Sequence, residues 1–180
     1  MIVGLTIWRA SEHLSQFIID NPDLFRGKRV CELGAGLGMV SILLGKLNVA
    51  SLIVASDGDD DTIDLLDENI ESTDSAHSVQ SAMLYWGELD EFRGKYPFKF
   101  DILMAADVIY MQEQVSPLMD TVVEILDREG PDSKFYLAYA RRNVPFDRVL
   151  EAATKRGLVG TLLDRGLNNA EPIYSFSFVK

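Results

Sequence analysis

The chain has 180 residues, enough for one domain with a substantial core, and its 47% hydrophobic and 25% charged residues are typical of a globular protein. No apolar run approaches the roughly 18 residues that a membrane-spanning helix needs, so we expect no membrane partner. Acidic residues outnumber basic ones 28 to 17, for a net charge of −11, which argues against a nucleic-acid partner and is compatible with a basic protein substrate or simply with solubility.

Apolar periodicity and turn residues predict that helices and strands alternate along most of the chain. In the helix expected at residues 60–71, for example, Ile63, Leu66 and Ile70 lie three and four positions apart on one face. In chain order, the expected elements are a helix at 11–20, a strand at 28–33, a helix at 39–47, a strand at 51–56, a helix at 60–71, strands at 79–84 and 100–106, a helix at 116–126, a strand at 134–140, a helix at 144–156, and strands at 158–163 and 173–179.

The expected strands are apolar on both faces, which is typical of a mostly parallel sheet covered by helices on both sides. The last two strands follow each other without a helix between them, so one antiparallel strand is expected near the C-terminus. We therefore predict one α/β domain over residues 1–180, built on a Rossmann-like, doubly wound, seven-stranded sheet. Ligands bind such sheets at the carboxyl ends of the strands, where the strand order reverses.

Residues 32–38, Glu-Leu-Gly-Ala-Gly-Leu-Gly, follow an apolar run and are the most informative segment of the sequence. Alternate glycines allow a tight turn and a close approach of the backbone to a ligand. A dinucleotide fingerprint would need a glycine at the position of Met39. Glu32 would repel a pyrophosphate and suits a cationic ligand. The loop therefore favours S-adenosylmethionine, which has no phosphate and carries an amino group and a sulfonium, over a nicotinamide cofactor.

A second acid, Asp57, ends the next expected strand, where its carboxylate can accept hydrogen bonds from both ribose hydroxyls of the cofactor. We place Gly58, the next residue, in the same cofactor-binding set. Residues 57–68 also mimic the spacing of a calcium loop, but Thr62 stands where that loop requires glycine. We expect the acids of this segment to begin a helix, and we predict no metal site.

Four segments carry a resemblance to a known group of enzymes. They are residues 4–11 with Trp8, the loop at 32–38, the Tyr-Trp-Gly step at 85–87, and residues 100–110, which end in Asp-Val-Ile-Tyr. In this order they resemble the class I, seven-stranded protein-lysine methyltransferases of eukaryotes. Members of that group modify chaperones, the valosin-containing ATPase, calmodulin and elongation factors. The similarity covers essentially the whole chain, but it does not indicate a particular substrate.

The resemblance implies a set of site residues. Asp107 and Tyr110 match the acid-x-x-aromatic element beside the transferred methyl group, so they are the expected catalytic residues. Each aligned residue also has an ordinary structural interpretation: either tryptophan as a core residue, Asp107 as a helix cap, and Tyr110 as a surface side chain. The positions that align with cofactor contacts are Trp8, Gly34, Ala35, Gly36, Asp57, Trp86 and Ala106.

The expected activity is the transfer of methyl groups from S-adenosylmethionine to a lysine side chain of a protein such as a chaperone, an ATPase or a translation factor. Asp107 would position the amine or accept its proton, and Tyr110 would offer an aromatic face or a hydroxyl. Transfer to a protein histidine or a small molecule, and a catalytically silent cofactor-binding scaffold, stay open as alternatives. Adenine-amine methyltransferases have two prolines where Val108 and Ile109 stand, which argues against a nucleic-acid acceptor.

Cellular context is indicated by few residues. The single cysteine, Cys31, lies in an apolar strand and predicts a reducing compartment, and residues 1–5 have no basic segment typical of a secretory signal. We expect a monomer in the cytoplasm, with the nucleus left open as a second location. Only seven residues precede Trp8, fewer than in the group's pattern, so a compact member and a shortened chain are both open.

Overall fold

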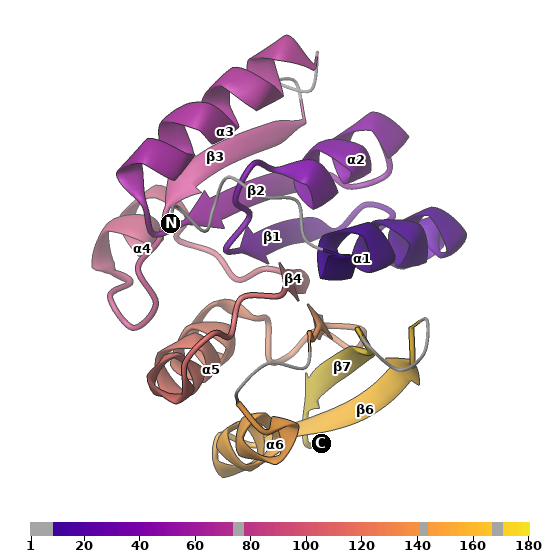
Figure 1. The fold of residues 1–180 in the computed structure, drawn as a ribbon, viewed down its shortest axis with the longest axis vertical. Coiled ribbons are helices and arrows are strands. Elements are labelled where there is room, and N and C mark those ends of the chain that lie inside the picture. Colours follow the sequence, from indigo (N-terminus) through magenta and orange to yellow (C-terminus); the bar gives the residue numbers. More distant parts are fainter. Residues whose placement is uncertain (1–8, 74–77, 141–143, 167–170) are drawn as a thin grey trace.

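A computed structural model describes residues 9–73, 78–140, 144–166 and 171–180. It is built on a seven-stranded sheet with the strand order β3-β2-β1-β4-β5-β7-β6 (Figure 1). The strands are β1 (Arg29–Leu33), β2 (Leu52–Asp57), β3 (Val79–Met83), β4 (Ile102–Ala106), β5 (Lys134–Ala138), β6 (Leu158–Asp164) and β7 (Ile173–Phe178).

Helices cover both faces of the sheet, and two separate hydrophobic clusters fill the space beneath them. The first cluster holds buried side chains of α1, α2 and α3, and the second holds those of α4, α5 and α6. Alternate residues of β4 point to the two clusters, as the period of a strand requires: Ile102 and Met104 to one, Leu103 and Ala105 to the other. The helices are α1 (Arg9–Asp20), α2 (Met39–Leu47), α3 (Asp60–Ser72), α4 (Asp90–Lys95), α5 (Val115–Ile125) and α6 (Phe146–Lys155), with short 3-10 turns η2 (Pro22–Leu24) and η3 (Gln112–Gln114).

The pairing of the strands confirms the predicted doubly wound topology. Strands β1 to β5 pair in parallel, and β7 runs antiparallel to both β5 and β6. The antiparallel strand near the C-terminus was predicted, and the structure places it between β5 and β6, so that β6 forms the edge of the sheet. The chain winds from β1 toward β3 in one direction and from β4 toward β5 in the other.

The strand order therefore reverses between β1 and β4, in the middle of the sheet. The carboxyl ends of the parallel strands lie on one side of the sheet, which we call the carboxyl edge. It is formed by the loops that follow β1, β2, β3 and β4. In doubly wound sheets the crevice at such a reversal is the place where ligands bind. The fold therefore predicts that a ligand binds at the loops that begin at Gly34, Gly58, Leu84 and Asp107.

The boundaries of the predicted helices and strands agree with the structure to within two residues. The acids expected to begin a helix do so: the side chain of Asp59 accepts a hydrogen bond from the backbone nitrogen of Thr62 at 2.9 Å and caps α3. Helix α4 was not predicted, because it is short, contains Gly94 and buries one large apolar side chain, that of Phe92. Within the described ranges, no helix has the length and apolar character needed to cross a membrane.

Candidate active site

The glycine loop after β1 is folded as the sequence predicts, because its glycines adopt a conformation that other residues rarely reach. Gly34, Gly36 and Gly38 all have positive φ angles, of 72°, 55° and 83°. The loop is also closely packed. A Cβ atom on Gly34 would lie 2.7 Å from Cγ1 of Val108 and 3.6 Å from Cζ2 of Trp86. The absence of a side chain at Gly34 thus allows three of the predicted site segments to meet.

Glu32 lies beneath this loop, and only 2% of the residue is exposed. Its Oε2 atom accepts hydrogen bonds from both the backbone nitrogen, at 3.0 Å, and the hydroxyl of Ser41. Ser41 is in the first turn of α2, whose N-cap, Gly38, has no side chain to serve that role. The carboxylate therefore substitutes for a cap at the positive end of the helix. Burial raises the pKa of Glu32 to about 7, although the bonds from Ser41 oppose the shift.

Asp57 joins the loop after β1 to the loop after β2. Its Oδ2 atom accepts a hydrogen bond from the backbone nitrogen of Gly36 at 2.9 Å, and its Oδ1 atom accepts one from Gly58 at 2.8 Å. Ala35 is tied to the same strand end, because its nitrogen donates to the carbonyl of Ser56 at 2.8 Å. Burial raises the pKa of Asp57 above its ordinary range, while backbone donors at Gly36, Gly58 and Asp59 act in the opposite direction.

The predicted Trp-Gly step forms a tight turn after β3. Tyr85 and Glu88 face each other across this turn in an isolated bridge, and Gly87 has a φ of 89°. The nitrogen of Gly87 donates to Oγ1 of Thr121 on α5, at 3.0 Å. Trp86 is half-buried and reaches the glycine loop at Gly34. That Trp86 lines the cofactor site stays a prediction.

The end of β4 carries the predicted catalytic acid in an unusual backbone conformation. Asp107 has a φ of 55°, in the left-handed region, and only 4% of the residue is exposed. Its backbone nitrogen donates to the carbonyl of Ala138 on β5 at 2.9 Å, directly after Ala106, which ends β4. A residue other than glycine in this region is strained, and such strain gathers at functional sites. The N-cap position of the following turn η3 is held by Met111.

Tyr110 is held by a side chain that the sequence analysis did not single out. The backbone nitrogens of Tyr110 and Met111 both donate to Oε1 of Gln114, at 2.8 and 3.0 Å. The Tyr110 side chain is half-buried and therefore not the simple surface residue of the alternative interpretation.

The structure thus places the predicted residues of four loops at the carboxyl ends of the strands, with Trp86 and Val108 close to Gly34 and Asp57 bonded to Gly36. Trp8 lies outside the described residues. Within the described part of the chain, no group of three or more His, Cys, Asp or Glu residues could hold a metal ion. Cys31 is fully buried in β1, and burial raises the pKa of its thiol to about 12, as expected for a packed thiol.

Three residues that support the site were missed: Ser41, Thr121 and Gln114. For two of them the sequence holds a signal, because Ser41 and Thr121 are polar residues on the apolar faces of predicted helices. A hydroxyl on the apolar face of a helix is expected to be buried, and a buried hydroxyl needs a hydrogen-bond partner. The position of the residue in the sequence therefore suggests a structural hydrogen bond. For Gln114 no comparable signal exists, because its partners are backbone nitrogens of an irregular segment.

These features define an α/β protein with a doubly wound sheet and a candidate cofactor site where its strand order reverses. The chain belongs to the lysine methyltransferase family, whose sequence profile matches residues 2–156. Among curated relatives, the chain is 31% identical over 160 residues to the protein-lysine N-methyltransferase EFM3 of Chaetomium thermophilum, a match that covers 86% of this chain and 48% of the relative. It is 33% identical over 139 residues to the calmodulin-lysine N-methyltransferase of Arabidopsis thaliana, covering 74% of this chain and 44% of the relative.

The chain therefore spans about half the length of these curated relatives. A solved structure with a similar fold is an O-methyltransferase from Bacillus cereus in complex with S-adenosylhomocysteine. The TM-score is 0.67 at 15% identity, and the match covers 98% of this chain and 83% of that one. At this identity the likeness shows the fold alone, and it agrees with the Rossmann-like topology described above.

Proposed function

We propose that this protein transfers methyl groups from S-adenosylmethionine to a lysine side chain of a protein substrate. The observation that carries the proposal is the meeting of the glycine loop, the Trp86 turn and the segment after Asp107 around Gly34, at the point where the strand order reverses. Family membership and the two lysine methyltransferases among its relatives support methyl transfer to lysine.

The residues present fit the cofactor. The glycines of the loop have positive φ angles and carry no side chains, so their backbone groups can approach a ligand closely. Asp57 uses one lone pair on each oxygen for Gly36 and Gly58, and a carboxylate offers about four acceptor positions in all. The backbone of Asp59 also donates to this carboxylate, which still leaves an acceptor position for a ribose hydroxyl. Trp86 offers an apolar face beside the loop.

S-adenosylmethionine, when bound, supplies an electrophilic methyl group on a sulfonium. The protein's task is to present a neutral amine in line with that group, because a protonated lysine has no lone pair to attack with. The carboxylate of Asp107 stands at the end of β4, where it can hold the lysine nitrogen and take its proton or pass it to water. Tyr110 borders the same place. Alignment of this kind contributes several kcal/mol to such reactions.

The acceptor is proposed to be a lysine of a protein such as a chaperone, an ATPase or a translation factor. The net charge of −11 favours the approach of a basic protein surface. We further propose that the protein acts as a monomer in the cytoplasm, with the nucleus open as a second location. The reduced, buried thiol of Cys31 fits that compartment.

The test is a transfer assay with radiolabelled S-adenosylmethionine and a lysate from cells that lack the protein. We expect a labelled protein band whose acid hydrolysate contains methylated lysine. Asp107→Asn is the matched control, because asparagine tolerates the left-handed backbone and removes the charge; it should bind S-adenosylhomocysteine and label nothing. Label in histidine, in RNA or in a small molecule would overturn the lysine assignment. An absence of cofactor binding by the wild-type protein would overturn the proposal itself.

A further inference from the structure

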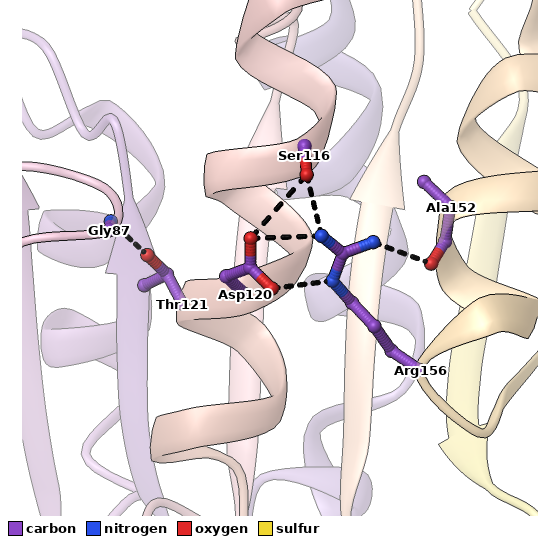
Figure 2. A network of polar contacts seen from close by, with 6 residues as sticks. All are labelled: Gly87, Ser116, Asp120, Thr121, Ala152 and Arg156. Carbon is purple, nitrogen blue, oxygen red and sulfur yellow. Dashed lines mark hydrogen bonds and ion pairs between the residues drawn. The ribbon is translucent and has the colours of Figure 1, made fainter.

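Thr121 is a polar residue on the buried face of α5. The residue is completely buried, and its neighbours Leu118, Met119 and Val122 belong to the hydrophobic cluster beneath the sheet. A buried hydroxyl needs a hydrogen-bond partner, and threonine is a poor helix former, so neither burial nor helix formation favours it here. Its Oγ1 atom accepts a hydrogen bond from the backbone nitrogen of Gly87 at 3.0 Å (Figure 2).

The partner, Gly87, belongs to the turn that carries Trp86. Within this turn, the nitrogen of Glu88 donates to the carbonyl of Tyr85 at 3.0 Å. The Gly87 nitrogen instead points to α5. The turn also lies close to the start of that helix, because a Cβ atom on Gly87 would be 3.8 Å from Cβ of Pro117. The hydrogen bond to Thr121 thus fixes the distance between this turn and α5.

We infer that Thr121 is a positioning residue for the cofactor site, acting through Gly87 on Trp86. The path is short: Thr121 holds Gly87, Gly87 follows Trp86, and Cζ2 of Trp86 lies 3.6 Å from where a Cβ atom of Gly34 would stand. The inference rests on the proposed function, because it assigns Thr121 to the binding of S-adenosylmethionine. Thr121 would touch neither the cofactor nor the substrate.

The opposite side of α5 offers a matched control, which Figure 2 shows beside Thr121. Asp120 binds Arg156, at the end of α6, through two contacts: Nε to Oδ1 at 2.7 Å and Nη2 to Oδ2 at 2.8 Å. Arg156 also donates to Oγ of Ser116 at 2.6 Å and to the carbonyl of Ala152 at 3.0 Å. This network joins α5 to α6 and points away from Gly87, although Asp120 is the residue before Thr121.

Three variants separate the two roles: Thr121→Val, which keeps the shape and removes the acceptor, Thr121→Ser, which keeps the hydroxyl, and Asp120→Asn, which weakens the α5–α6 network. Amide exchange at Gly87, followed by NMR, reports on the hydrogen bond. Calorimetry with S-adenosylhomocysteine gives Kd, and the transfer assay gives KM and kcat for S-adenosylmethionine. Thermal unfolding reports on stability and is measured for all three.

For Thr121→Val we expect faster exchange at Gly87 and a Kd for S-adenosylhomocysteine about five- to tenfold higher, the loss expected from one neutral hydrogen bond. KM for S-adenosylmethionine should rise by a similar factor, with kcat at saturation within about twofold of the wild type. Thr121→Ser should restore both values. Asp120→Asn should lower the melting temperature and leave the Gly87 amide and Kd unchanged.

Two results would overturn the inference. One is faster exchange at Gly87 in Thr121→Val with an unchanged Kd, because the bond would then have no effect on the cofactor site. The other is an equal loss of affinity in Asp120→Asn, because that would indicate a general loosening of α5. If wild-type protein does not bind S-adenosylhomocysteine, the proposed function fails and this inference with it, whatever the exchange data show for the bond.

Discussion

Gly36 and Asp57 are 21 positions apart in the sequence, and the backbone nitrogen of Gly36 lies 2.9 Å from Oδ2 of Asp57. This bond ties the glycine loop after β1 to the end of β2. The nitrogen of Gly58 donates a second hydrogen bond to the other carboxylate oxygen, Oδ1, at 2.8 Å. Asp57 therefore shapes the loop in addition to its proposed role as the acceptor for ribose hydroxyls. The two roles are compatible because a carboxylate accepts more than two hydrogen bonds.

The first prediction concerns this double role. Asp57→Ala should weaken the binding of S-adenosylhomocysteine by about 10- to 100-fold, since it removes charged hydrogen bonds worth roughly 1.5–3 kcal/mol each. Calorimetry measures the effect. Asp59→Ala is the control, because it removes the cap of α3 and should cost about 1 kcal/mol of stability without changing Kd. Equal affinity of Asp57→Ala and the wild type would remove Asp57 from the cofactor site.

The fold was predictable because most of the parallel strands are largely apolar runs and the helices between them have clear periodicity. Strand β4 is the clearest case, since all its residues are buried. The alternation of such strands with helices leaves few possible topologies. Helix α4 was missed because its single large buried side chain, Phe92, makes no periodic pattern. The inner position of β7 could not be predicted, because no local signal distinguishes an inserted strand from an edge strand.

The candidate site was predictable to the extent that single residues carry recognisable chemistry. The glycines at 34, 36 and 38 have the positive φ angles that their spacing suggests. The hydrogen bonds from Ser41 to Glu32 were not predicted, because they depend on how α2 packs against β1, which is a feature of the tertiary structure. The same holds for the left-handed conformation of Asp107, which the surrounding strands impose on a residue with an ordinary sequence context.

The second prediction tests the close packing at Gly34. Gly34→Ala should abolish measurable binding of S-adenosylhomocysteine, because the new Cβ would lie 2.7 Å from Cγ1 of Val108 and displace the loop. Gly27→Ala is a matched control: its φ of 68° is similar, but a Cβ there meets nothing within 4 Å. Both variants should lose about 1–2 kcal/mol of stability to backbone strain.

Only Gly34→Ala should lose the cofactor, as measured by calorimetry alongside urea unfolding. Full binding by Gly34→Ala would show that the loop can move away from Val108 without cost. The contact would then not define the cofactor site.

The third prediction separates the charge of Asp107 from its backbone. Asp107→Asn and Asp107→Ala should both lose methyl transfer while they still bind S-adenosylhomocysteine. Asp107→Ala should be less stable than Asp107→Asn by about 1 kcal/mol, because alanine reaches the left-handed region less readily than asparagine. Urea unfolding measures the difference. Equal stabilities would show that the strained conformation relaxes in the variants, and full transfer by either would remove Asp107 from the catalytic residues.

Glu32 gives the protein a pH dependence of stability whose sign follows from its surroundings. Burial raises the pKa of Glu32 from 4.5 to about 7 in the folded protein. Between these values the folded state binds its proton more tightly than the unfolded chain does. The resulting stabilisation is fully present below about pH 4.5 and is lost as the pH rises through about 7. A shift of this size corresponds to on the order of 3 kcal/mol.

The fourth prediction compares the wild type with Glu32→Gln, which keeps the shape and cannot ionise. Between pH 5 and pH 8 the free energy of unfolding of the wild type should fall relative to that of Glu32→Gln, by up to about 3 kcal/mol. Urea unfolding at several pH values measures both curves. Parallel curves would mean that Glu32 ionises at its ordinary pKa in the folded protein. The bonds from Ser41 would then offset the whole cost of burying the charge, and the acid beneath the glycine loop would be a carboxylate throughout the physiological range.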